Sequence, residues 1–249
     1  MSGNIYESDR MLHDYLLFHY GTVEDLIPWR DGPRDAYGFP ERCVDCLDLE
    51  SLSSDSRALD LGCSVGRSTI ELSKYCSEVI GIDYSQAFID AANQIKREGS
   101  HTVNILESGA HVRKVEVHVP VNSNVDRITF QQGDAHELAD ELGQFDVVIA
   151  CNLMCRLKEP RRVLERFSAL VKPGGQLFLT TPCTWLEEFT DKEKWLGGQN
   201  EAESTLDAIQ LAFKSTFELV KTVDIPFVFR EHYRKYQWTM SQGSLWRRK

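Results

Sequence analysis

Three aspartates each follow a short apolar stretch, in positions that suit the binding of a nucleotide. Asp60 precedes the turn Gly62–Gly66, where small residues allow backbone N–H groups to approach a ligand at the start of a helix. Asp83 follows 23 residues later, where an acid accepts hydrogen bonds from two ribose hydroxyls. Asp134 follows a third apolar stretch and could accept a hydrogen bond from an adenine amino group. Because parallel strands end at one edge of a sheet, the three acids predict a nucleoside site there.

Two of these acids, and Asp146 at the start of a later apolar stretch, also have structural alternatives. Asp60 could cap a helix, Asp134 could be an ordinary N-cap acid and Asp146 a turn residue. Their recurrence at one edge of one sheet favours ligand binding. A nicotinamide dehydrogenase uses the same geometry, but its glycine fingerprint requires a third glycine near Thr69, which this sequence lacks.

The elements that must position these acids alternate between strand and helix. Short apolar stretches bounded by turn residues predict strands, and amphipathic stretches predict helices. The alternation predicts the α/β class, with a doubly wound, mostly parallel, Rossmann-like sheet. The predicted strands are 57–61, 78–82, 127–131, 145–150 and 176–180, and the predicted helices are 67–75, 86–97 and 160–171.

Further segments lie outside this repeat. Alternating apolar residues at 102–119 predict an inserted β-hairpin. After a predicted helix at 202–215, residues 217–229 and 233–246 are expected to pair antiparallel at the sheet edge, which brings the sheet to seven strands. The prediction is a single domain over 1–249, with an N-terminal cap (1–56), a core (57–180) and an acceptor-side region (181–249).

Composition limits the function classes. A formal net charge of −10 opposes nucleic-acid binding, which depends on a basic face. No apolar run reaches the roughly 18 residues of a membrane span, and the first residues lack a signal peptide, so we expect no membrane partner and a cytoplasmic location. The seven cysteines are an odd number and scattered, which fits reduced thiols. Cys43 and Cys46 have the C-x-x-C spacing without a second ligand pair, so we expect structural roles and no metal site.

With these motifs in place, the sequence resembles class I S-adenosylmethionine (SAM) methyltransferases over about residues 57–180. Asp60, Gly62 and Gly66 match the first motif of that family, and Ser64 stands where a glycine is usual. The resemblance implies SAM as cofactor, S-adenosylhomocysteine as product and no metal. It also matches residues 146–152 to the strand and loop beside the transferred methyl group, and Lys172–Gly175 to the turn before the fifth strand. The cofactor-binding residues that it implies are Asp60, Gly62, Ser64, Gly66, Asp83, Tyr84, Asp134, Ala135 and Cys151.

Segments outside the core, together with the loop after the fourth strand, indicate the class of acceptor. Nucleic-acid amino-methyltransferases have an Asn/Asp-Pro-Pro-aromatic loop after the fourth strand, whereas this chain has Cys151–Cys155 there. Residues 15–21, 185–189 and 230–238 resemble the methyltransferases of ovothiol biosynthesis. That resemblance implies methylation of an imidazole nitrogen of 5-sulfanylhistidine, the last step of ovothiol A biosynthesis. Since the chain holds no sulfoxide synthase portion, it also implies a functional link to a separate sulfoxide synthase.

Such a substrate sets requirements for the acceptor site. An amino acid needs a cation for its carboxylate, an acid or carbonyl for its ammonium and flat walls for its ring. Because sulfur is the better nucleophile, the site must hold the ring nitrogen in line with the methyl group and turn the sulfur away. A histidine could take the proton that the imidazole loses, although both histidines, like the arginine, have structural alternatives. The candidates are Arg230 for the carboxylate, Glu187 for the ammonium, Tyr20, Trp185 and Trp195 for the walls, His19 and His232 for the proton, and Asn152 beside the methyl group.

Two other hypotheses about the function are compatible with the sequence. The core motifs do not specify the acceptor, so the chain could methylate another small amine, thiol or carboxylic acid. It could also bind SAM without catalysis, as a partner subunit. The sequence predicts neither the oligomeric state nor the identity of a general base.

Overall fold

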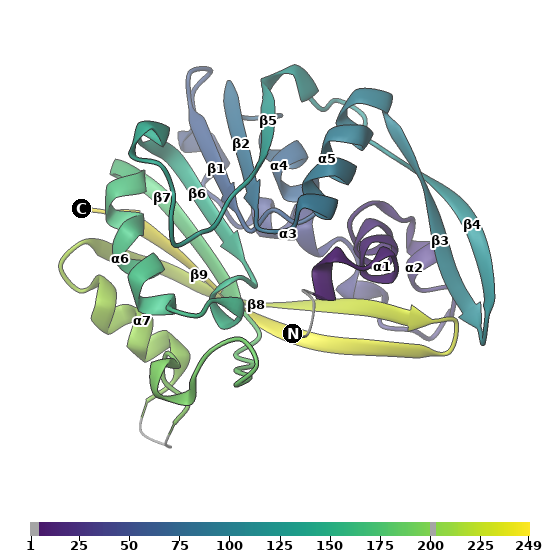
Figure 1. Ribbon diagram of the computed structural model, residues 1–249. Coiled ribbons are helices and arrows are strands. Elements are labelled where there is room, and N and C mark those ends of the chain that lie inside the picture. Colours follow the sequence, from purple (N-terminus) through teal and green to yellow (C-terminus); the bar gives the residue numbers. More distant parts are fainter. Residues whose placement is uncertain (1–4, 200–202) are drawn as a thin grey trace.

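The computed structural model describes residues 5–199 and 203–249 as one α/β unit (Figure 1). The strands are β1 (Arg57–Leu61), β2 (Glu78–Asp83), β3 (Ser100–Ser108), β4 (His111–His118), β5 (Ile128–Gln132), β6 (Phe145–Cys151), β7 (Val171–Thr181), β8 (Phe217–His232) and β9 (Lys235–Arg248). The α-helices are α1 (Asp9–Tyr20), α2 (Val23–Leu26), α3 (Phe39–Asp45), α4 (Arg67–Leu72), α5 (Gln86–Glu98), α6 (Pro160–Leu170) and α7 (Thr205–Phe213). Short 3-10 helices include η1 (Ile5–Glu7), η5 (Asp140–Leu142) and η6 (Met154–Arg156).

The main sheet has seven strands in the order β5-β2-β1-β6-β7-β9-β8. The first five run parallel, and β9 runs antiparallel between β7 and β8. The chain passes from β1 through β2 to β5 on one side and continues with β6 on the other, so the strand order reverses between β1 and β6. Ligands of open α/β sheets bind at the carboxyl ends of the strands at such a reversal. The predicted doubly wound, mostly parallel seven-stranded sheet is confirmed.

Two apolar cores cover the two faces of this sheet. Side chains alternate along each strand, so Ala58 packs in one core and Leu59 in the other. Helices α1, α3, α4 and α5 contribute to the first core, and α6 and α7 to the second. Parallel strands covered on both faces are apolar nearly throughout, which is why β1, β2 and β6 could be recognised in the sequence.

The element boundaries differ from the predicted ones mainly at helix ends. Helix α4 ends at Leu72, and turns carry the chain on to Tyr75, within the predicted helix. Strand β7 already begins at Val171 and includes the predicted turn Lys172–Gly175, with an irregular register against β6. Helix α7 begins at Thr205, where Ser204 and Asp207 form a capping box; the predicted start at residue 202 lies outside the described residues.

The cap is held between two hairpins. Strands β3 and β4 form their own two-stranded sheet, as predicted for the insertion. The β8–β9 hairpin extends beyond the main sheet, passes α1 and reaches the β3–β4 hairpin (Figure 1). Two ion pairs join these parts: Arg113 of β4 lies 3.0 Å from Asp25 of α2, and Arg230 of β8 lies 3.1 Å from Glu107 of β3.

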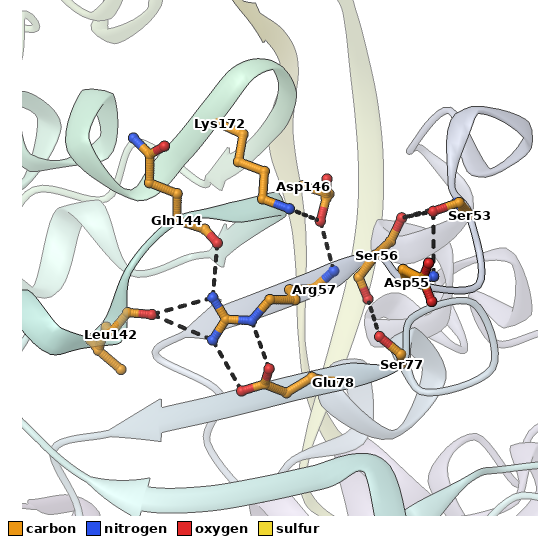
Figure 2. A network of polar contacts seen from close by, with 10 residues as sticks. All are labelled: Ser53, Asp55, Ser56, Arg57, Ser77, Glu78, Leu142, Gln144, Asp146 and Lys172. Carbon is orange, nitrogen blue, oxygen red and sulfur yellow. Dashed lines mark hydrogen bonds and ion pairs between the residues drawn. The ribbon is translucent and has the colours of Figure 1, made fainter.

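A polar network fixes the amino ends of the central strands (Figure 2). The Arg57 side chain donates to Glu78 at 2.6 Å and 3.0 Å and to the Gln144 carbonyl at 3.0 Å. Asp146 accepts hydrogen bonds of 2.8 Å from the Arg57 backbone N–H and from Lys172. Asp146 therefore holds β1, β6 and β7 together at the sheet edge opposite the expected site, and only the Cys151 end of β6 reaches the site edge.

No helix in the described ranges combines the length and apolar character that crossing a membrane requires.

Candidate functional site

The turn after β1 is connected to the end of β2. The backbone N–H of Ser64 donates to Oδ2 of Asp83 at 2.8 Å, and the N–H of Ser85 donates to Oδ1 at 2.9 Å. The N–H of Gly62 donates to the Ile82 carbonyl at 2.8 Å. Burial raises the pKa of Asp83, although the backbone N–H donors act to lower it. The predicted glycine turn and the second acid therefore lie together at the carboxyl edge.

Two glycines allow the turn to take its form and to pack against neighbouring side chains. Gly62 has φ +79°, and a Cβ there would lie 3.0 Å from Leu153. Gly66 has φ +90°, and a Cβ there would collide with Phe130. Ser64 also lies in the left-handed region, with φ +52°, and its buried Oγ has no hydrogen-bond partner within the described chain. A backbone of this form with an unsatisfied buried hydroxyl fits a polar ligand group approaching the turn.

Asp60 lies inside the sheet beneath this turn. It is 1% exposed, and Oγ1 of Thr69 donates to its carboxylate at 2.7 Å. Burial raises the pKa of Asp60 to about 7, against the Thr69 hydrogen bond and with a further increase from Asp83. Asp60 thus anchors the first turn of α4 and places a second acid behind the glycine turn.

The third acid lies in the loop after β5. Asp134 Oδ1 accepts from the His136 backbone N–H at 2.8 Å and contacts His136 Nδ1 at 2.7 Å. Partial burial acts to raise the pKa of Asp134, but the His136 hydrogen bonds outweigh it and the pKa is lowered. Ala135 follows it and borders a cavity of about 690 Å³ between this loop and α6. Tyr84, after β2, is 62% exposed, so an aromatic surface is available beside Asp83.

Asn152 lies directly after β6 with φ +54°. Its Oδ1 accepts hydrogen bonds from Thr180 Oγ1 at 2.9 Å and Ser241 Oγ at 2.7 Å. Its side-chain amide nitrogen makes no hydrogen bond within the described chain, so its two N–H groups can donate to a ligand. The neighbouring Cys151 contacts the buried Cys43 thiol.

His19 and Tyr20 lie against the glycine turn. Nδ1 of His19 accepts from the Arg67 backbone N–H at 3.3 Å, and burial lowers the pKa of His19 to about 3. The Tyr20 hydroxyl donates to the Val65 carbonyl at 2.7 Å. His19 is therefore neutral and weakly basic, so it supports the glycine turn and is poorly suited to take up a proton. Tyr20 packs against the same turn and does not form a wall of an acceptor site.

The structure does not present Arg230 as an open fork for a carboxylate. Arg230 is 2% exposed, donates to the Asp25 carbonyl and is paired with Glu107. It lies at the junction of the cap and the two hairpins. His232 lies at the end of β8, where its Nδ1 accepts from the Arg234 backbone N–H at 3.3 Å across the hairpin turn. Arg230 therefore joins the β8–β9 hairpin to Asp25 and Glu107, although its buried Nε and Nη2 make no hydrogen bond within the described chain. His232 stabilises the hairpin turn.

The three expected residues of the 181–200 loop do not line the carboxyl edge either. Trp185 is buried in the second core, and its Nε1 donates to Thr205 Oγ1 at 3.1 Å. Trp195 stacks on it at 6.5 Å and donates to the Thr190 carbonyl. Glu187 is exposed and has no polar partner among the described side chains. The tryptophans stabilise the loop, and Glu187 lies at its surface.

A cluster that the sequence did not predict lies beside Asn152. Arg156, at the end of η6, contacts Tyr6 of η1 through a side-chain hydrogen bond. Tyr15 of α1 packs against Tyr6 at 6.1 Å and against Phe229 of β8 at 5.2 Å. Arg156 follows Asn152 by four residues. An arginine in the loop after the fourth predicted strand was the one sequence feature that could have indicated this cluster.

No group of three His, Cys, Asp or Glu side chains gathers to hold a metal ion within residues 5–199 and 203–249.

The sequence is similar to known methyltransferases. Residues 36–216 match the family described as "Methyltransferase domain". A ubiquinone biosynthesis O-methyltransferase of Pseudomonas aeruginosa is 29% identical over 139 residues, which are 55% of this chain and 49% of that protein. A protein of the same description from Coxiella burnetii is 27% identical over 123 residues, 49% of this chain and 42% of that protein. The matches thus span about half the length of these curated relatives.

Solved structures share the fold. Magnesium protoporphyrin IX methyltransferase of Synechocystis PCC 6803, solved with bound SAM, is 15% identical with a TM-score of 0.53, and the match covers 100% of each chain. The [4+2]-cyclase SpnF is 18% identical with a TM-score of 0.55, over 87% of this chain and 72% of that one. A cyclase among these neighbours shows that the fold alone does not determine the reaction.

Proposed function

The chain belongs to the methyltransferase-domain family, and we propose that it transfers a methyl group from SAM to an imidazole nitrogen of 5-sulfanylhistidine. The hydrogen bond between Ser64 and Asp83 supports the cofactor part of the proposal, because it joins the two motifs expected to hold SAM at the strand-order reversal.

The residues at the carboxyl edge fit SAM. Asp83 has the position to accept the ribose hydroxyls, and Asp134 and Ala135 lie where an adenine amino group would be bound. The unsatisfied Ser64 hydroxyl fits a polar group lying against the turn. When bound, SAM supplies a sulfonium methyl group that a nucleophile attacks in line.

The choice of acceptor rests on the three segments outside the core, residues 15–21, 185–189 and 230–238. Tyr15, from residues 15–21, packs on Phe229, directly before residues 230–238. Phe189, from residues 185–189, lies under the Arg156 guanidinium at 4.8 Å. One contact thus packs residues 15–21 against β8, and the other packs residues 185–189 against Arg156, four residues after Asn152. Such a site must above all fix the orientation of the substrate, because the substrate sulfur has to be kept away from the methyl group.

The chain's own residues would orient the acceptor and exclude water. Asn152 can donate from its amide nitrogen, and Thr180 and Ser241 fix the orientation of that amide through Oδ1. The aromatic rings of Tyr6 and Tyr15 offer flat surfaces. Burial keeps His19 neutral and weakly basic. The proton that the imidazole loses would therefore pass to solvent or to the substrate thiolate.

A second candidate is O-methylation of a small hydroxyl-bearing acceptor, which the descriptions of the curated relatives favour. A third is binding of SAM without catalysis. The leading proposal also includes a functional link to a separate sulfoxide synthase.

One assay separates these candidates. The purified protein is incubated with methyl-labelled SAM and 5-sulfanylhistidine, with histidine and small phenols as comparison acceptors, and each product is mapped by NMR. Label on an imidazole nitrogen supports the proposal. Label on sulfur or on a phenolic oxygen replaces it with another acceptor. Calorimetric SAM binding without turnover of any acceptor leaves the non-catalytic candidate.

A further inference from the structure

We propose that the guanidinium of Arg156 binds an anionic group of the acceptor, which is the carboxylate when the acceptor is an amino acid. The inference deepens the proposed function, since it rests on methyl transfer at this site. It gives the carboxylate a different partner from the buried Arg230.

The position of Arg156 suits this role. Helix η6 begins at Met154, two residues after Asn152, at the carboxyl end of β6 and therefore beside the strand-order reversal. The side chain is half-buried, and its electrostatic neighbours include Tyr6, Tyr15 and Cys155. Tyr6 contacts Arg156, and the backbone carbonyl of Tyr6 accepts a hydrogen bond of 3.1 Å from Oγ of Ser85, two residues after the predicted ribose acid Asp83.

The guanidinium is held in a defined orientation. Its Nη1 donates to the Cys155 carbonyl at 3.1 Å and to the Thr184 carbonyl at 3.1 Å. Its plane lies over Phe189, and Tyr6 contacts it through a hydrogen bond. An arginine fixed by neutral partners loses little conformational freedom on binding a ligand, and its planar fork matches a carboxylate.

Neutral partners alone leave the charge of Arg156 uncompensated. Three other buried or half-buried arginines have acids: Arg57 has Glu78, Arg67 has Glu41 and Glu71, and Arg230 has Glu107. Arg42 and Arg248 are also half-buried, and they donate to the backbone carbonyls of Pro226 and Val171. Within residues 5–199 and 203–249, Arg156 has no ion pair with a carboxylate. Because removing an unpaired charge from water is costly, a half-buried cation without a counter-ion favours an anionic ligand.

The segment over Arg156 is also fixed. Glu7 accepts hydrogen bonds from the backbone N–H groups of Gln86 at 3.1 Å and Ala87 at 3.3 Å, the first residues of α5. Ser85 Oγ donates to the Tyr6 carbonyl at 3.1 Å. An acceptor held by Arg156 would therefore lie under Tyr6, between η1 and the end of β6.

The test compares Arg156→Gln and Arg156→Lys with the wild type. Arg161→Gln is the matched control, because Arg161 is an exposed arginine on the neighbouring α6. Two acceptor pairs are used, 5-sulfanylhistidine with its decarboxylated amine and histidine with histamine. KM is measured where methyl transfer occurs, and binding to the protein loaded with S-adenosylhomocysteine is measured by ligand-observed NMR.

We expect Arg156→Gln to raise KM or Kd for the carboxylate-bearing member of a pair by roughly tenfold or more, as expected for loss of a charge-assisted pair. The decarboxylated member should change little, the Lys variant should be intermediate, and Arg161→Gln and the SAM affinity should be unchanged. The unchanged SAM affinity also shows that the variant is folded.

Two results would overturn the proposal. One is an equal loss for both members of each pair. The other is a wild type that does not prefer the carboxylate-bearing member of any pair. If 5-sulfanylhistidine is not methylated but another carboxylate is bound through Arg156, the acceptor identity fails and the role of Arg156 stands.

Discussion

The carboxylate of Asp83 accepts a hydrogen bond of 2.8 Å from the backbone N–H of Ser64, and this bond joins the end of β2 to the turn after β1. Ser64 has φ +52°, a conformation that costs a non-glycine residue about 1–2 kcal/mol. The hydrogen bond helps to hold the turn in this form before a ligand binds. Asp83 therefore holds the turn, in addition to the ribose contact that we propose for it.

Asp83→Ala should weaken SAM binding by about 2–4 kcal/mol, because it removes charged hydrogen bonds to the ribose and releases the turn. Asp134→Ala should be milder, since a single adenine contact is lost and Asp134 is already bonded to His136. Isothermal calorimetry with SAM checks both. An unchanged affinity for Asp83→Ala, or a larger loss for Asp134→Ala, contradicts the assignment.

Ser64→Gly should stabilise the ligand-free protein by up to about 1 kcal/mol, because glycine adopts a positive φ without strain and the change removes an unsatisfied buried hydroxyl. Thermal unfolding measures this. Ser64→Ala is the control, since it removes the hydroxyl and keeps the strain. If the hydroxyl binds SAM, both variants should lose affinity by a similar factor; a loss in the glycine variant alone points to turn rigidity instead.

Asp60 should make the stability of the protein fall as the pH rises from about 4 to 7. Burial raises its pKa in the folded state from 3.8 to about 7, so the folded state binds more protons than the unfolded state in this window. Asp60→Asn should remove this contribution. The difference in unfolding free energy between variant and wild type should thus shift in favour of the variant between pH 5 and pH 8, by on the order of a few kcal/mol.

Urea unfolding at the two pH values provides the measurement. The comparison across pH cancels the fixed effect of the new amide group. A difference that is the same at pH 5 and pH 8 would show that Asp60 titrates normally.

Arg230→Met should lower the unfolding free energy by about 1–3 kcal/mol without a selective effect on the acceptor, because it breaks a buried pair and leaves Glu107 with Arg113 alone. Adding Glu107→Gln should recover part of the loss. Chemical denaturation gives the stability, and acceptor KM is measured beside it. Normal stability with a tenfold higher KM for the carboxylate substrate alone would return Arg230 to the acceptor site.

The sequence by itself determined the sheet and the cofactor edge. Strands β1 and β2 are buried nearly throughout and read as apolar runs with Asp60 and Asp83 near their ends, whereas β5, before Asp134, alternates between buried and exposed residues. The carboxyl ends of parallel strands lie at one edge of a sheet, so these local patterns place the three acids there. The pairing of β8 with β9 could also be predicted, because two long β-like stretches are joined by a short turn.

Only the tertiary structure decided the surroundings of the acceptor residues. No local sequence pattern shows that Arg230 is paired with an acid and Arg156 is not. The inserted hairpin supplies Glu107 to Arg230, whereas Arg156 lies over Phe189 and has no ion pair among the described residues. Trp185 is in a polar loop by sequence, yet α7 covers it. Burial and ion pairing depend on segments that are distant in the chain, and no local pattern encodes those contacts; they settle which side chains are free to meet a substrate.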